Sequence, residues 1–114
     1  MYIKRTKQET IKTISMCLGL YRKIANEISV KHDVTRTEFE IILFGYDYEH
    51  FNRTALVENV PCSFSTLKKS LAYLVENQYI RVVRERAHFK SRLYSLTRKS
   101  RLMITKFYNQ MNIN

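Results

Sequence analysis

The stretch VPCSFSTLKKSLAYLVENQYI, residues 60–80, decides the fold. Its proline ends one helix, and Ser63 can cap the next, which we expect over about 64–77. Apolar residues at helical spacing predict the inward stripe of that helix: Leu67, Leu71, Leu74 and Val75. Hydroxyls and lysines occupy its first two turns instead, which an ordinary core helix does not need. Such a beginning is typical of a helix that inserts its first turns into a polyanion.

A short helix is predicted just before this one. Asn52 is its candidate N-cap, 53–59 its extent, and Leu56 its inward residue. A short helix, a tight turn and a longer polar-fronted helix make a helix-turn-helix, which places its second helix in the major groove of DNA. The candidate DNA-binding residues of the second helix are Ser63, Phe64, Ser65, Thr66, Lys68, Lys69 and Tyr73. Hydroxyls can bond phosphates or base edges, and lysines can reach phosphates or guanine.

After the leucine stripe the apolar period changes from 3.6 to 2. YIRVVRER and SRLYSLT are rich in β-branched and aromatic residues and are separated by AHFK, so we expect a two-stranded hairpin. A hairpin in this position is a wing, here 81–96. The candidate DNA-binding residues of the wing are Arg84, Arg86, Lys90 and Arg92. They would contact the DNA backbone or enter the minor groove, where narrow AT-rich DNA attracts guanidinium groups.

The charge is distributed unevenly. The chain carries 20 Lys and Arg against 10 Asp and Glu, a net charge of +10. Residues 61–101 hold ten of the cations and two acids, net +8, whereas residues 1–60 hold nine cations and eight acids, net +1. A positive field confined to about a third of the chain predicts a polyanion docked on one face. The alternative is a basic, soluble surface that has no partner.

The rest of the chain predicts further helices. Residues 10–31 have an amphipathic pattern in which Cys17 lies on the apolar face, where we expect it to be buried. The spacing Thr35-x-x-Glu38 is a capping box that starts a second helix, with Gly45 as its C-cap. A last helix is expected over 98–112. The prediction is a mainly α winged helix-turn-helix domain with a small β-hairpin, α-α-α-α-β-β-α, over 1–114.

Several classes of protein are disfavoured. No run of 18 apolar residues occurs, and the basic N-terminus lacks an apolar signal core, so we expect a cytoplasmic protein without a membrane span. Cys17 and Cys62 show no CxxC or His–Cys spacing, which argues against a disulfide scaffold or a metal site. Cys62 precedes a helix start and is therefore a candidate redox residue, but core packing is the favoured role. Without a nucleophile–base motif, glycine loop or carboxylate pair, we expect no enzyme and no cofactor.

From Val34 to Thr97 the sequence resembles the MarR family of winged-helix transcriptional regulators. VTRTEFEIILF resembles the family's Leu-Thr-x-x-(Gln/Glu)-Phe at the start of the second helix. CSFSTLKKSLAYLVENQYI matches Leu-Ser-x-Ser-Thr-Val followed by a leucine stripe and an apolar pair. LYSLTRKS matches the end of the wing and the Leu-Thr-x-Lys-Gly that opens the next helix. The order and spacing of these pieces together carry the resemblance.

The resemblance implies a DNA-binding lobe over 34–97 and a homodimer built on the helices over 10–31 and 98–112. It also implies a repressor on a pseudo-palindromic double-stranded site, and a small-molecule effector pocket between dimer interface and DNA-binding lobe. Two departures are present. The family's Asp-x-Arg at the wing falls on His88 and Lys90, which removes the orienting salt bridge, and its glycine after the recognition helix is Gln78.

Three hypotheses follow. The first is sequence-specific double-stranded DNA binding by a transcriptional regulator. The second is a winged helix used for protein–protein assembly, which the +8 segment disfavours because such a module needs no cations on both helix and wing. The third is a replication or mobile-element DNA-binding factor, which the sequence does not separate from the first. Two side chains stay open: Phe64 touches a thymine methyl or folds back on the preceding turn, and Tyr73 reaches a phosphate or is an ordinary surface tyrosine.

Overall fold

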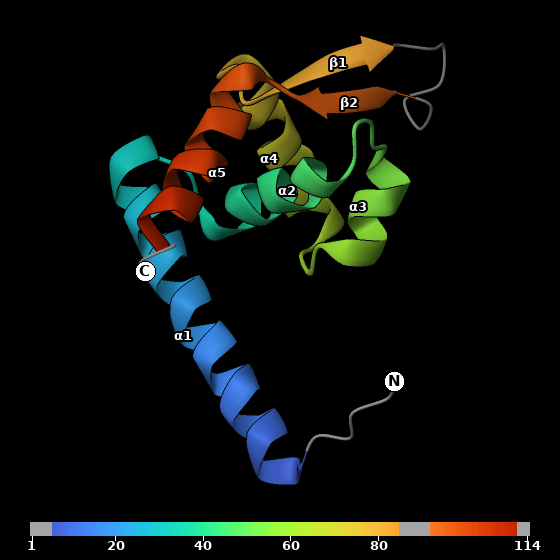
Figure 1. The fold of residues 1–114 in the computed structure, drawn as a ribbon. Helices are drawn as coiled ribbons and strands as arrows, with labels where there is room; N and C mark the ends of the chain where they lie inside the picture. The colour runs from blue at the N-terminus through green and yellow to red at the C-terminus, as the bar shows by residue number, and fades with distance from the viewer. Residues whose placement is uncertain (1–5, 85–91, 112–114) are drawn as a thin grey trace. The chain divides into compact units, whose positions relative to one another are not determined.

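The structure, a computed structural model, describes residues 6–84 and 92–111 (Figure 1). Its elements are α1 (Lys7–His32), α2 (Arg36–Asp47), α3 (Arg53–Asn59), α4 (Phe64–Glu76), β1 (Ile80–Arg84), β2 (Leu93–Leu96) and α5 (Arg98–Met111). The predicted order of helices and hairpin is confirmed. The chain divides into two compact units, one ending at Val34 and the other beginning at Thr35. None of the described helices is both long and apolar enough to cross a membrane.

The described part of the first unit, residues 6–34, contains a single helix, α1. The Thr6 side chain caps its start by accepting a hydrogen bond from the Glu9 N–H at 3.1 Å, and Asp33 ends it in the left-handed region at φ 54°. Large apolar side chains between 44% and 85% exposed recur along it: Ile11, Ile14, Met16, Leu18, Leu20 and Val30. Cys17 is exposed as well, so its predicted burial is wrong. The reason is that residues 6–34, the described part of this unit, contain no second element against which the middle turns of α1 could pack.

The second unit has its own apolar core. The predicted capping box starts α2, because the Thr35 N–H donates to Glu38 Oε1 at 2.9 Å and the Glu38 N–H donates to Thr35 Oγ1 at 3.2 Å. Buried apolar residues come from every element of the unit: Phe39, Ile41, Ile42, Phe51, Leu56, Val60, Leu67, Leu71, Leu74, Tyr79, Ile80, Tyr94, Leu96, Met103 and Phe107. The predicted leucine stripe of α4 is therefore confirmed, while Val75 at its edge is half-buried.

Gly45 lies inside α2 and not at its end, so the predicted C-cap is wrong. The helix continues to Asp47, and the N–H of the capping residue Tyr48 donates to the Gly45 carbonyl at 3.3 Å. A Cβ at position 45 would stand 2.7 Å from Phe51 Cε1 and 3.0 Å from Leu96 Cδ2. Glycine is needed here because two core side chains approach the helix backbone, and not because of an unusual φ angle.

The hairpin is antiparallel and is anchored at its base. Ile80 pairs with Leu96 and Val82 with Tyr94, with a register shift between Val82 and Arg84. Phe51, in the loop before α3, joins β2 through an isolated bridge, because its N–H donates to the Tyr94 carbonyl at 3.0 Å and the Tyr94 N–H donates back at 2.8 Å. This bridge attaches the loop before the helix-turn-helix to β2, the second strand of the wing.

The turn between α4 and β1 contains one residue in the left-handed conformation, at the position where the MarR family has glycine. Gln78 adopts it, at φ 62°. The Thr97 hydroxyl donates to the Gln78 carbonyl at 2.6 Å, and the buried Ser100 hydroxyl donates to the Tyr79 carbonyl. The start of α5 is therefore hydrogen-bonded to the turn that follows α4, which fixes the base of the hairpin.

Candidate nucleic-acid interface

α3 and α4 form the helix-turn-helix, and both predicted N-caps are confirmed. Asn52 Oδ1 accepts a hydrogen bond from the Ala55 N–H at 2.8 Å. Ser63 Oγ accepts from the Thr66 N–H at 3.1 Å and donates to Thr66 Oγ1 at 2.9 Å. The Ser63 hydroxyl is thus engaged at the helix start, where it fixes the direction in which α4 leaves the turn.

The face of α4 away from its leucine stripe is exposed and basic in its first half. Ser65, Thr66, Lys68 and Lys69 are all exposed, while Tyr73 is half-buried on the flank of this face. Two further exposed residues, which carry no positive charge or hydroxyl signal for DNA in the sequence, continue the spacing from Lys69: Ala72 and Glu76. The small side chain of Ala72 lets a docked surface approach the helix backbone. Glu76 makes the second half of the face less positive than the first.

Phe64 lies exposed at the start of α4 and contacts a cation of α3. Its ring is 54% exposed, and the guanidinium of Arg53 lies 4.7 Å from the ring centroid. This cation–π contact joins the first residue of α3 to the first residue of α4. It brings a cation from the nearly neutral part of the chain, 1–60, to the front of the helix-turn-helix. Sequence spacing gave no signal for it, because the two residues meet only once the turn is folded.

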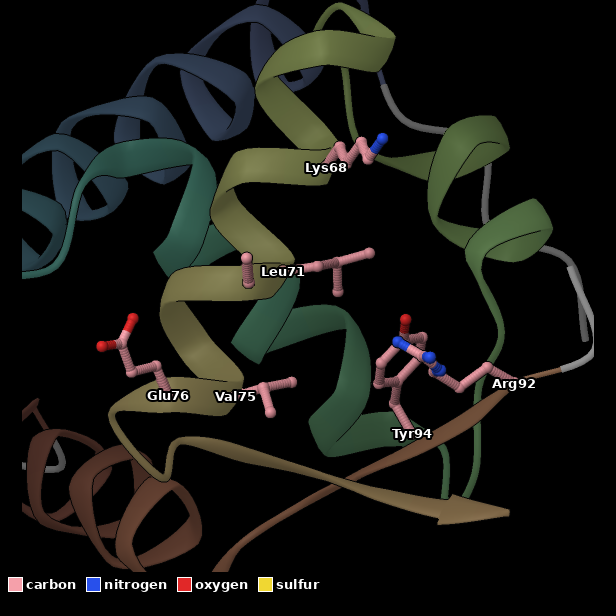
Figure 2. A pocket seen from close by; sticks show the side chains of 7 residues that line it. Lys68, Leu71, Val75, Glu76, Arg92 and Tyr94 are labelled. Atoms are coloured by element: carbon pink, nitrogen blue, oxygen red, sulfur yellow. The ribbon is translucent and has the colours of Figure 1, made fainter. Parts of the chain in front are cut away.

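A groove of about 350 Å³ runs between α4 and β2 (Figure 2). Its lining residues are Lys68, Leu71, Ala72, Val75, Glu76, Arg92 and Tyr94. In Figure 2 the side chains of Lys68, Leu71 and Val75 follow one another down α4, and those of Arg92 and Tyr94 lie together on the β2 side. The structure therefore brings one predicted cation of the helix and one of the wing to the same groove.

The other predicted wing residues are placed only in part. Arg84 is the last residue of β1, and its backbone pairs with Leu93. Arg86, His88 and Lys90 lie outside the described residues. Cys62 is half-buried just before the Ser63 cap. Within the described ranges, no three His, Cys, Asp or Glu side chains are grouped so that they could hold a metal ion.

The sequence matches no protein-family model, and no curated protein matches it. Solved structures do match. A transcriptional regulator from Thermotoga maritima has a TM-score of 0.74 and 16% identity, over 90% of this chain and 72% of that one. A cysteine-to-serine variant of E. coli MarR, complexed with operator DNA, has a TM-score of 0.66 and 15% identity, over 96% and 80%. Staphylococcus aureus MarR, in complex with salicylate and kanamycin, has 0.66 and 19%, over 94% and 79%.

The chain has the MarR winged-helix fold. The fold implied by the sequence resemblance is therefore confirmed over nearly the whole chain. Within the MarR fold, α4 is the second helix of the helix-turn-helix and β1–β2 is the wing (Figure 1). The predicted DNA-binding residues that the structure describes belong to α4, to its N-cap, or to the two ends of the wing at Arg84 and Arg92.

Proposed function

We propose that this protein is a sequence-specific double-stranded DNA-binding protein that regulates transcription. The observation that carries the proposal is the exposed face of α4, with cations in its first half, next to a hairpin whose Arg92 borders the same groove as Lys68. A helix-turn-helix uses this end of its second helix to contact base edges. The MarR structure solved with operator DNA supports the same use of the fold.

In the proposed complex α4 enters the major groove, which is about 12 Å wide and admits one helix. Ser65 and Thr66, exposed on the first turn, contact phosphates or base edges, and the positive end of the helix dipole favours phosphate there. Lys68 and Lys69 follow one turn later and reach phosphates or guanine. Arg53 acts through Phe64, because its guanidinium holds the ring at the front of the helix. Tyr73, on the flank, contacts the sugar–phosphate backbone.

The wing contributes affinity more than sequence preference. The four wing cations predicted from the sequence contact the DNA backbone or the minor groove: Arg84, Arg86, Lys90 and Arg92. With Lys68 and Lys69 they make six cations. Six phosphate contacts predict a slope of about −5 for the logarithm of the association constant against the logarithm of salt concentration.

We further propose that the chain is a single domain, 1–114, that acts as a cytoplasmic homodimeric repressor. The lobe over 34–97 binds DNA, and the helices over 10–31 and 98–112 form the dimer interface. Exposed large apolar side chains support this interface: six lie along α1, and Tyr108 lies on α5. A two-fold dimer presents two copies of α4 to half-sites one helical turn apart, so the target is a pseudo-palindrome. A small-molecule effector follows by analogy with the neighbour solved with salicylate and kanamycin.

The experiment that tests this proposal is selection of bound duplexes from a random library with the full chain, followed by stoichiometry on the enriched sequence. We expect an enriched site with two symmetric halves, bound by two chains. Recovery of duplexes without a shared sequence would contradict sequence-specific binding, and a single asymmetric half bound by one chain would contradict the dimer. Fusion of the enriched site to a reporter promoter then separates a regulator, which changes expression, from a replication or mobile-element factor.

A further inference from the structure

A second basic hollow, of about 510 Å³, lies at the base of the hairpin. Its lining residues are Arg81, Leu96, Thr97, Arg98, Arg101, Leu102 and Thr105. Three guanidinium groups from two elements, β1 and α5, border it, and none of these seven described residues is acidic. None of them is among the residues proposed to contact DNA. The cations of residues 61–101 are therefore divided between two places, whereas the sequence pattern alone suggested one face.

The sequence of α5 explains why these side chains share one side. Arg98, Arg101, Leu102 and Thr105 recur at intervals of three and four, which places them along one face of a helix. The buried residues of α5 follow a different stripe: Ser100, Met103 and Phe107. Anchoring the helix to the core therefore leaves the arginine-bearing face of α5 available to the hollow.

The hollow is built on a fixed frame. The Thr97 hydroxyl accepts a hydrogen bond from the Ser100 N–H at 3.4 Å while it donates to the Gln78 carbonyl, so the first turn of α5 is held at the base of the hairpin. The guanidinium of Arg101 lies 5.7 Å from the centroid of the Tyr46 ring, a cation–π contact that restrains it. The arginines of α5 therefore lie on a helix whose first turn is hydrogen-bonded to the base of the wing.

Electrostatics favours an anion at this position. The three guanidinium groups around the hollow repel each other, and the attraction of each group to an anion between them outweighs that repulsion. The N-terminus of α5 adds the positive end of a 14-residue helix. Leu96 and Leu102 add apolar surface beside the arginines. The volume falls within the range of about 300–1,000 Å³ that is typical of small-molecule sites.

We propose that this hollow binds a small molecule that carries a phosphate monoester. A phosphate monoester has a charge of about −1.5 to −2 near neutral pH, which suits three arginines better than a single carboxylate does. Guanidinium groups pair bidentately with phosphate oxygens. The Thr105 hydroxyl offers a further donor, and the two leucines contact the organic part of the ligand. The proposal does not depend on DNA binding.

The test uses the full chain and phenyl phosphate, titrated by calorimetry and by amide NMR. We expect saturable binding, with the largest shifts at the backbone amides of residues 98–101. Arg98→Gln with Arg101→Gln should weaken binding about tenfold or more, because each loses a charge-assisted hydrogen bond. The matched control, Arg36→Gln with Lys106→Gln, removes the same two charges from exposed positions outside the hollow and should change the affinity less than about twofold.

Several results would overturn the proposal. Equal weakening by both double variants would mean non-specific attraction to net charge, and benzoate binding as tightly as phenyl phosphate would remove the requirement for a dianion. A third result is that the unaltered protein does not bind phenyl phosphate, while Arg98→Gln with Arg101→Gln weakens duplex binding and the control variant does not. The hollow would then be assigned to a DNA phosphate. A changed sedimentation coefficient in the Arg98/Arg101 variant, again without phosphate binding, would assign the hollow to contact with a second copy of the chain.

Discussion

Replacing Gly45 by alanine tests how the hairpin is anchored on α2. The new Cβ would lie 2.7 Å from Phe51 Cε1, and 3.0 Å and 3.1 Å from Leu96 Cδ2 and Cγ. Both neighbours are buried, and Phe51 is also held through its backbone by the bridge to Tyr94. The clash therefore cannot be relieved by rotating one exposed side chain. Either α2 moves away from the hairpin, or Phe51 and Leu96 leave their positions.

The magnitude follows from two opposed terms. Overpacking a well-packed core costs about 1–3 kcal/mol. Alanine in a helix interior recovers about 1 kcal/mol relative to glycine. Since two buried neighbours are affected and one is restrained by its backbone, we expect the upper part of the first range. The free energy of unfolding should therefore fall by about 1–2 kcal/mol.

Urea unfolding followed by circular dichroism measures this loss. Gly19→Ala is the matched control, because a Cβ at position 19 meets nothing within 4 Å and the site lies in the interior of a helix. That variant should not lower the free energy of unfolding. If Gly45→Ala is as stable as the unaltered protein, the close approach of Phe51 and Leu96 to α2 does not limit this position and the reasoning is refuted.

Three further predictions concern the helix-turn-helix and the wing. Gln78→Gly should raise the free energy of unfolding by about 1 kcal/mol, because glycine accepts φ 62° without a Cβ penalty; urea unfolding checks it, and an unchanged midpoint would argue against strain at Gln78. Ser63→Ala should lower the free energy of unfolding by about 1 kcal/mol through loss of the α4 cap, whereas Ser65→Ala, two residues beyond the cap, should be nearly neutral. Arg84→Ala with Arg86→Ala should weaken duplex binding for all sequences and reduce the salt slope by about 2; a loss confined to one site would mean that the wing reads bases.

Local signals in the sequence were sufficient for much of the fold. The caps at Thr35, Asn52 and Ser63 are satisfied by side chains within three residues of the backbone groups that they bond. The leucine stripe of α4 and the change of period that begins the hairpin are likewise short-range patterns. These features were predictable because neighbours in sequence decide them. The exposed placement of Lys68 and Lys69 follows from the same stripe, since the leucines take the opposite face.

The remaining features depend on contacts between distant segments. The sequence pattern at Gly45 predicts a helix end. Glycine is instead required there because Leu96, in β2, approaches the helix backbone. Arg53 reaches Phe64 only through the folded turn. The ten cations of residues 61–101 look like one group along the chain, yet the hairpin and α5 direct three arginines to a separate hollow. Pattern and composition do not encode such pairings, so the sequence could not show how the positive charge is shared.

The most direct test of the central claim is the salt dependence of duplex binding by Lys68→Ala with Lys69→Ala, measured by fluorescence anisotropy on the selected site. If the exposed face of α4 enters the duplex, the slope should change from about −5 to about −3, and affinity at moderate salt should fall about tenfold or more. Arg36→Ala with Lys106→Ala removes equal charge elsewhere and should leave both nearly unchanged. Unaltered affinity and slope in the Lys68/Lys69 variant would contradict the assignment of α4 as the DNA-reading helix.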